Sequence, residues 1–117
     1  MGFPYNHAAK EKTNIMICYV ARKKEVAFCD NGDKEVTNDI CSDCYESHAL
    51  AREKVQSLAR ERFHAYWNAI HEKGLNLSVS REEDDSGDCA IVKCGRDSVL
   101  YYVGTVVVVT KKGDDAK

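Results

Sequence analysis

Four cysteines in the first half of the chain have spacings that suit a metal ion. They are Cys18, Cys29, Cys41 and Cys44, and the last two form a C-x2-C pair. The segments on either side of Lys23-Lys24 are rich in β-branched and aromatic residues, which is typical of a hairpin. In that register Cys18 and Cys29 face each other with Cβ atoms about 5 Å apart. The sequence therefore predicts a structural zinc site, because four thiolates form the tetrahedral set that Zn²⁺ prefers.

The fourth ligand has an alternative in His48. This residue follows Cys44 by four positions, so both lie on one face if the segment is helical. Sites with three cysteines and one histidine are as familiar as sites with four cysteines. Two readings without metal also stay open: reduced thiols buried as small hydrophobic groups, and a disulfide between Cys18 and Cys29, which needs an oxidising compartment.

Thiol chemistry is a third functional hypothesis for the C-S-D-C segment. Cys41 and Cys44 stand where a helix is expected to begin, and thiol pKa values fall at such positions. A thioredoxin-like fold normally places a proline opposite the dithiol, and the only proline is Pro4. A nucleophile and base pair of Cys44 with His48 has no third orienting group. We therefore expect a protein that is not an enzyme.

The pattern of a hairpin beside a C-x2-C helix start resembles a treble-clef-like zinc finger. The spacing between Cys18 and Cys29 is also similar to that of the B-box. The resemblance covers about a quarter of the chain. The first cysteine pair is not C-x2-C, and Ala21 stands where a B-box has its first histidine. The resemblance implies a ligand role for the four cysteines and no particular function.

Length and composition limit the classes of function. The chain has 117 residues, a formal net charge of -2 and 31% charged residues, which suits one domain and argues against a general polyanion binder. Six cysteines without a recognisable secretory leader favour a reducing, cytoplasmic setting. The most apolar stretch, residues 101–110, is about half the length of a membrane span, so no membrane partner is expected.

The expected fold class is α+β. A zinc-stapled β-hairpin at the N-terminus precedes one long amphipathic helix, and a C-terminal antiparallel sheet of about three strands packs on that helix. In chain order we expect an irregular arm over 1–13, the hairpin and zinc site over 14–48, the helix over 43–73, strands over 75–111 and a tail over 112–117.

The helix is predicted to begin at Asp43 as N-cap and to end at Gly74. At 100° per residue, the stripe expected to face the core contains Cys44, His48, Ala51, Val55, Leu58, Ala59, Tyr66 and Ile70. A helix of this length spans about 45 Å, so it kinks or overhangs. An overhanging end exposes Tyr66 and Trp67, and Arg62 falls inside the apolar stripe, where it could pair with a partner's carboxylate. These three residues are therefore candidates for binding a partner.

The C-terminal third alternates with the period of β-strands. Leu75, Leu77 and Val79 are expected on one face of a strand, and the acidic segment 82–88 is interpreted as a charged turn. A second hairpin turns near Gly95 and Asp97, and Cys89 and Cys94 point to opposite faces.

The last strand is apolar on both faces, with Gly104 as a bulge or bend. Such a strand is central in its sheet or crosses an interface.

Together these features predict a small zinc-binding protein-protein interaction module, a regulator or inhibitor whose partner is another protein or a second copy. The partner would meet the long helix or the last strand. The alternative function is a nucleic-acid-binding zinc finger, a less expected reading. Its basic residues would be Lys10, Lys12, Arg22, Lys23, Lys24, Arg52, Lys54 and Arg60.

Overall fold

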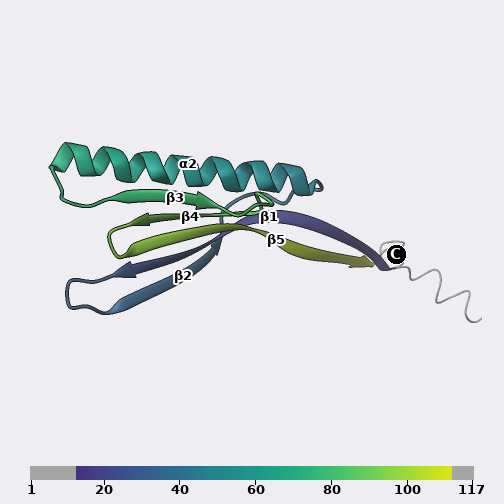
Figure 1. The fold of residues 1–117 in the computed structure, drawn as a ribbon. Coiled ribbons are helices and arrows are strands. Elements are labelled where there is room, and N and C mark those ends of the chain that lie inside the picture. The colour runs from purple at the N-terminus through teal and green to yellow at the C-terminus, as the bar shows by residue number, and fades with distance from the viewer. Residues whose placement is uncertain (1–12, 112–117) are drawn as a thin grey trace, which may run out of the picture.

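The computed structural model describes residues 13–111, and these form one five-stranded antiparallel sheet with one helix against it (Figure 1). The elements are β1 (Thr13–Phe28), β2 (Lys34–Ile40), α2 (His48–Lys73), β3 (Val79–Glu83), β4 (Cys89–Cys94) and β5 (Asp97–Lys111). The strand order is β2-β1-β5-β4-β3. The predicted α+β class with one helix is confirmed, but the sheet is single and has five strands instead of about three.

The first and last strands are the central pair of the sheet. β1 and β5 pair without interruption from Thr13 with Lys111 to Val26 with Ser98. The prediction that the long apolar strand is central is therefore confirmed for the part of β5 that also pairs with β4. β5 extends past that part, because β4 reaches only as far as Tyr102.

The predicted hairpin with its turn at Lys23-Lys24 is wrong. β1 runs straight through these lysines, which pair with Asp39 and Asn38 of β2 on one side and with β5 on the other. The turn lies at residues 29–33, where Gly32 has φ 90° and donates its N–H to the Cys29 carbonyl at 2.9 Å. Asn31-Gly32 is the stronger turn signal, and it decides the register.

The helix ends as predicted and begins later than predicted. Gly74 caps α2 in the left-handed conformation, φ 64°, with its N–H on the Ile70 carbonyl. The N-cap is Ser47, whose hydroxyl accepts the Leu50 N–H at 3.3 Å, and not Asp43. The segment before it stays extended because Tyr45 exchanges two backbone hydrogen bonds of 2.7 Å with Tyr19.

The core lies between α2 and one face of the sheet. Helix residues Ala51, Val55, Ala59 and Ile70 are buried, as the predicted stripe requires. The sheet contributes Ala21, Ala90, Val92, Val99 and Tyr101. Two alanines on the helix let it approach the strands closely, and the core is made mostly of valine and alanine, with Tyr101 as its largest buried side chain.

The C-terminal strands follow the predicted order with two differences. β4 and β5 are joined by a tight turn at Gly95-Arg96, as expected. Leu75 and Leu77 lie outside the strands and are exposed, because β3 begins only at Val79. Gly104 is not a bulge, since its pairing with Val20 keeps the register continuous. Cys89 and Cys94 lie on opposite faces of β4, as predicted.

The ends of the chain complete the comparison with the predictions. The predicted arm over residues 1–13 lies almost wholly outside the described residues, and the tail over 112–117 lies wholly outside them. Within residues 13–111, α2 is the only helix, and it is not apolar enough to cross a membrane.

Candidate functional surfaces

The predicted four-cysteine site is not assembled. Cys18 and Cys29 are eleven residues apart along one extended stretch, which places them about 36 Å from each other. They cannot share an ion with Cys41 and Cys44, nor form the alternative disulfide. Among residues 13–111, no group of three or more His, Cys, Asp or Glu side chains is arranged to hold a metal ion.

The two later cysteines have separate surroundings. Cys41 lies beside β1, where its thiol donates to the Ala21 carbonyl at 3.3 Å. Burial raises the pKa of this thiol, although Lys23 and Lys54 act against the rise. Cys44 is exposed and precedes the helix instead of starting it. A raised pKa is the opposite of what an activated thiol needs, so the environment of Cys41 does not favour redox chemistry.

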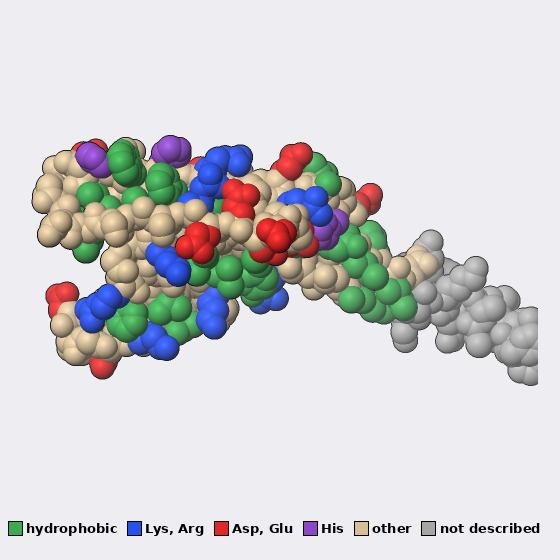
Figure 2. Space-filling model, in the orientation of Figure 1, with side chains coloured by type: hydrophobic (Ala, Val, Ile, Leu, Met, Phe, Trp, Pro, Cys, Tyr) green, Lys and Arg blue, Asp and Glu red, His purple; other side chains and the backbone are tan. Residues whose placement is uncertain are grey.

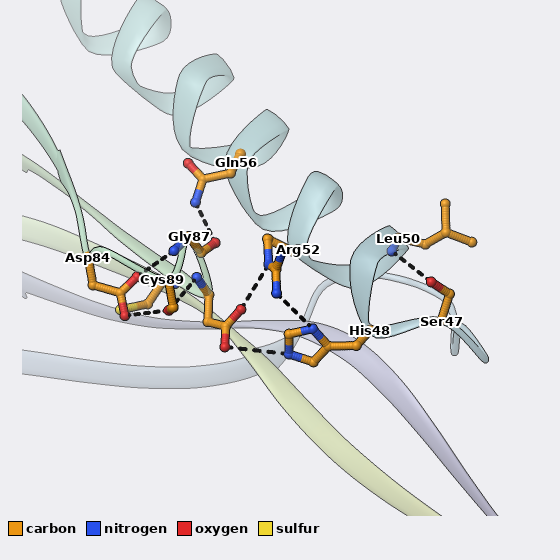
Figure 3. Close-up of polar contacts among 10 residues, drawn as sticks. Ser47, His48, Leu50, Arg52, Gln56, Asp84, Gly87 and Cys89 are labelled. Carbon is orange, nitrogen blue, oxygen red and sulfur yellow. Dashed lines mark hydrogen bonds and ion pairs between the residues drawn. The ribbon is translucent and has the colours of Figure 1, made fainter.

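His48 anchors the helix start to the acidic turn between β3 and β4 (Figure 3). Its Nε2 lies 3.4 Å from the Asp88 carboxylate, and its Nδ1 lies 3.2 Å from an Arg52 nitrogen. Arg52 Nε also donates to Asp88 at 3.0 Å, and Gln56 donates to the Gly87 carbonyl at 2.7 Å. These contacts engage His48 in holding α2 on the sheet, in place of the predicted alternative role as a zinc ligand.

The acidic turn is ordered by its own hydrogen bonds. Asp84 accepts from the Ser86 hydroxyl at 2.9 Å and from the Gly87 N–H at 3.0 Å. The hydrogen bond from Ser86 and those from the backbone N–H groups lower the pKa of this carboxyl. The segment 82–88 is therefore a structured turn, in agreement with its interpretation as a charged connection.

The three predicted partner-binding residues on α2 divide into two kinds. Arg62 is engaged within the chain, because it pairs with Glu25 at 3.3 Å and lies over the Tyr66 ring at 5.7 Å. Burial acts to lower the pKa of Arg62, but Tyr101, Tyr66 and Glu25 outweigh it and hold the pKa above its usual value. Trp67 is exposed and stacks on Phe63, so its partner role stays a prediction.

A hollow of about 410 Å³ opens between α2 and the strands beside Arg62. Its lining includes Lys23, Cys41, Glu61, Arg62 and Tyr101. Charges of both signs line it, and Arg62 is already paired with Glu25. The Cys41 thiol in this lining donates to the Ala21 carbonyl at 3.3 Å.

One end of the β1-β5 pair extends beyond the helix and forms what we call the apolar ribbon, residues 14–19 with residues 105–109. It begins where the His48 ring meets the Tyr19 ring edge-on at 5.3 Å. Beyond that point Ile15, Ile17, Val107 and Val109 share the helix side of the sheet, and Ile15 is 68% exposed. Figure 2 shows these strands as a continuous hydrophobic surface at one end of the described molecule.

The second surface is the sheet face turned away from α2, which we call the open face. Strand alternation and register assign its members. They are Arg22, Lys24, Val26, Phe28, Lys34, Val36, Asn38, Ile40, Ser80, Glu82, Cys89, Ile91, Lys93, Ser98, Leu100 and Tyr102. Lys and Arg side chains are spread among hydrophobic ones over the strands below the helix in Figure 2.

The basic residues predicted to bind nucleic acid are not on one surface. Arg22 and Lys24 lie on the open face, whereas Lys23 lies on the helix side. Arg52 is paired with Asp88, and Lys54 and Arg60 belong to α2. Lys10 and Lys12 are outside the described residues. Sequence reasoning missed Lys34 and Lys93, which the register places on the open face with Arg22 and Lys24, and Arg96, which lies over Phe28.

Comparison of the chain with protein-family models, with curated proteins and with solved structures finds no match. The apolar ribbon and the open face are the two candidate functional surfaces of the described residues.

Proposed function

We propose that this protein is a protein-protein interaction module and that a second copy of the chain is its partner at the apolar ribbon. The observation that carries the proposal is the exposure of Ile15, Ile17, Val107 and Val109 on one face of the ribbon, with Met16 exposed on the other. A contiguous apolar surface of this kind marks a site of association.

The edges of the ribbon, like its faces, favour self-association. β2 pairs with β1 only from Arg22 onward, and β4 pairs with β5 only up to Tyr102. Among the described residues, the ribbon edges beyond Tyr19 and Val103 have no further strand beside them. Free edges accept another strand, and a two-stranded ribbon alone is marginally stable in water.

The chemistry of the ribbon favours a second copy over a charged partner. Residues 14–19 and 105–109 include no Lys, Arg, Asp or Glu, so the matching surface is also uncharged and apolar. In a two-fold arrangement each ribbon supplies the same patch to the other.

The energy available is consistent with association. Complete burial of one such side chain contributes about 1.5 to 3 kcal/mol. The four half-exposed side chains on the helix side of the ribbon therefore contribute about 3 to 6 kcal/mol from each copy. Both copies together exceed the lower estimates of the cost of association, about 4 kcal/mol, so we expect a dimer that forms between micromolar and millimolar concentration.

The test compares two exposed isoleucines by sedimentation velocity. Ile17 is 52% exposed on the ribbon, and Ile40 is 54% exposed on β2. We expect the wild-type chain and Ile40→Glu to associate as concentration rises, and Ile17→Glu to stay monomeric with an unchanged circular dichroism spectrum. A wild-type chain that stays monomeric up to millimolar concentration contradicts the proposal. An equal loss of self-association in Ile17→Glu and Ile40→Glu also contradicts it.

Zinc has no part in this proposal, because the structure does not bring the predicted ligands together. The narrower role of regulator or inhibitor stays a prediction. Measuring the oligomeric state comes first, since it decides whether the ribbon is available to other proteins.

A further inference from the structure

The two faces of the sheet differ in charge where β1 and β2 pair. On the helix side these strands present Glu25, Glu35 and Asp39 beside Lys23. The open face has Arg22 and Lys24 at successive outward positions of β1, Lys34 opposite Phe28 at the end of β1, and Lys93 on β4. Its one carboxylate within the strands is Glu82, on the far edge strand. The open face therefore has an excess of positive charge, although the net charge of the chain is -2.

Aromatic and aliphatic side chains separate these cations. Tyr102 lies opposite Arg22 across the central strand pair, and Leu100 lies opposite Lys24. Phe28 ends β1, where the Arg96 guanidinium lies 5.1 Å from its ring centroid. All three apolar side chains are partly exposed. The open face thus offers ring surfaces and positive charges in alternation, about one strand spacing apart.

Arg22 is held close to this platform by Gly104. A Cβ at Gly104 would lie 2.5 Å from the Arg22 Cδ, so only glycine leaves room for the side chain to cross β5. The Arg22 Nε is buried and has no hydrogen-bond partner within residues 13–111. The stem of the Arg22 side chain therefore lies against Gly104, on the same face of the sheet as Tyr102.

We propose that the open face binds single-stranded RNA. Arg22, Lys24 and Lys93 contact phosphates in this arrangement, and bases stack on Tyr102. Single strands bind in this way to sheets that combine a basic surface with exposed aromatic rings. Asn38 and Ser98 lie level with Lys24 and Val26 on the same face, where they supply polar groups that can bond a ribose 2′-hydroxyl.

Two other polyanions fit the open face less well. A duplex presents its bases inside grooves that a helix or a narrow ribbon enters, whereas the open face is a broad sheet five strands wide. An acidic peptide satisfies the cations but has no rings to cover Tyr102. A depression of about 230 Å³ beside Glu82, Cys89 and Ile91 marks the acidic boundary of the face.

The experiment measures the fluorescence anisotropy of a labelled oligouridine of about twelve nucleotides, a length within the range that such sites cover. We expect saturable binding at low salt. The variant Lys24→Ala should make the salt dependence shallower by about 0.7 in slope. Tyr102→Leu should weaken binding roughly tenfold, the effect of losing one stacked base. The matched control is Arg60→Ala, which removes an exposed cation of α2. It should change neither the salt dependence nor the affinity for oligouridine.

Competition with other polyanions separates the classes of ligand. The proposal requires oligouridine to bind more tightly than a DNA strand of the same length, a DNA duplex or polyglutamate. Equal binding of polyglutamate or of the duplex overturns it, because charge alone then explains the affinity. Equal binding of the DNA strand overturns the choice of RNA. The whole inference is overturned if oligouridine binding is undetectable. It is also overturned if Lys24→Ala and Arg60→Ala lose the same amount of oligouridine affinity.

Discussion

The two ends of the β1-β5 pair both place a β5 valine on the helix side of the sheet, but these valines have opposite surroundings. At one end α2 covers the pair and β2 and β4 flank it, so Val99 is 0% exposed. At the other end, past the start of α2, Val107 is 58% exposed. Both valines belong to β5 and point to the same side of the sheet. The difference shows that the reach of neighbouring elements, and not residue type, divides this strand into a core segment and a contact surface.

The largest expected effect comes from placing one charge at each of these valines. Val99→Asp buries a carboxylate without a partner, which costs several kcal/mol, so we expect the variant to be unfolded by circular dichroism. At protein concentrations low enough for the chain to be monomeric, Val107→Asp places the same charge in water. That variant should fold normally and lose self-association in sedimentation.

This pair of variants also tests the comparison itself. If Val107→Asp unfolds the chain at concentrations where the wild type is monomeric, the ribbon belongs to the core of the monomer. If Val99→Asp stays folded, the helix does not cover β5 as the structure indicates.

Gly104 lies at the boundary between the two ends and gives the second effect. Gly104→Ala places a methyl group against the Arg22 side chain, and overpacking of this kind costs about 1 to 3 kcal/mol. Chemical denaturation should therefore show a lower midpoint. The double variant Gly104→Ala with Arg22→Ala should recover most of the lost stability. A double variant as unstable as Gly104→Ala would mean that the backbone, and not Arg22, requires glycine.

The smallest effect concerns the residue that starts the helix. Ser47→Ala removes the cap on the Leu50 N–H and should cost about 1 kcal/mol in the free energy of unfolding. The matched control is Asp43→Ala, at the position that the sequence predicted as N-cap, and it should change stability little. If Asp43→Ala lost more free energy of unfolding than Ser47→Ala, α2 would begin earlier and cover more of the ribbon than the structure shows.

Local signals predicted the elements that local interactions determine. Gly74 ends the helix, the stripe with Val55 and Ala59 faces the core, and the turn at Gly95 joins two strands; each needs only neighbouring residues. The hairpin at Lys23-Lys24 failed because a sixteen-residue strand is much longer than the usual five or six. The Asn31-Gly32 signal was the better guide.

The surfaces were harder to predict because both depend on pairing between distant residues. The exposure of Ile17 follows from where α2 and β2 stop, which no local pattern indicates. The basic open face requires Lys24, Lys34 and Lys93 to share one side of the sheet, and this depends on pairing among four strands. The four cysteines seemed close only under a register that placed Cys18 opposite Cys29, so one misplaced turn created the expected zinc site.

The central pairing of the first and last strands has a consequence during synthesis. Ile17 cannot pair with Val107 until a further ninety residues have been made. At a ribosomal rate of about 5 to 20 residues per second, this interval lasts roughly 5 to 20 seconds. During that time β2 is the partner that β1 meets first, and it leaves the apolar N-terminal half of β1 unpaired. A nascent chain is therefore most exposed to aggregation or to chaperones just before its final strand emerges.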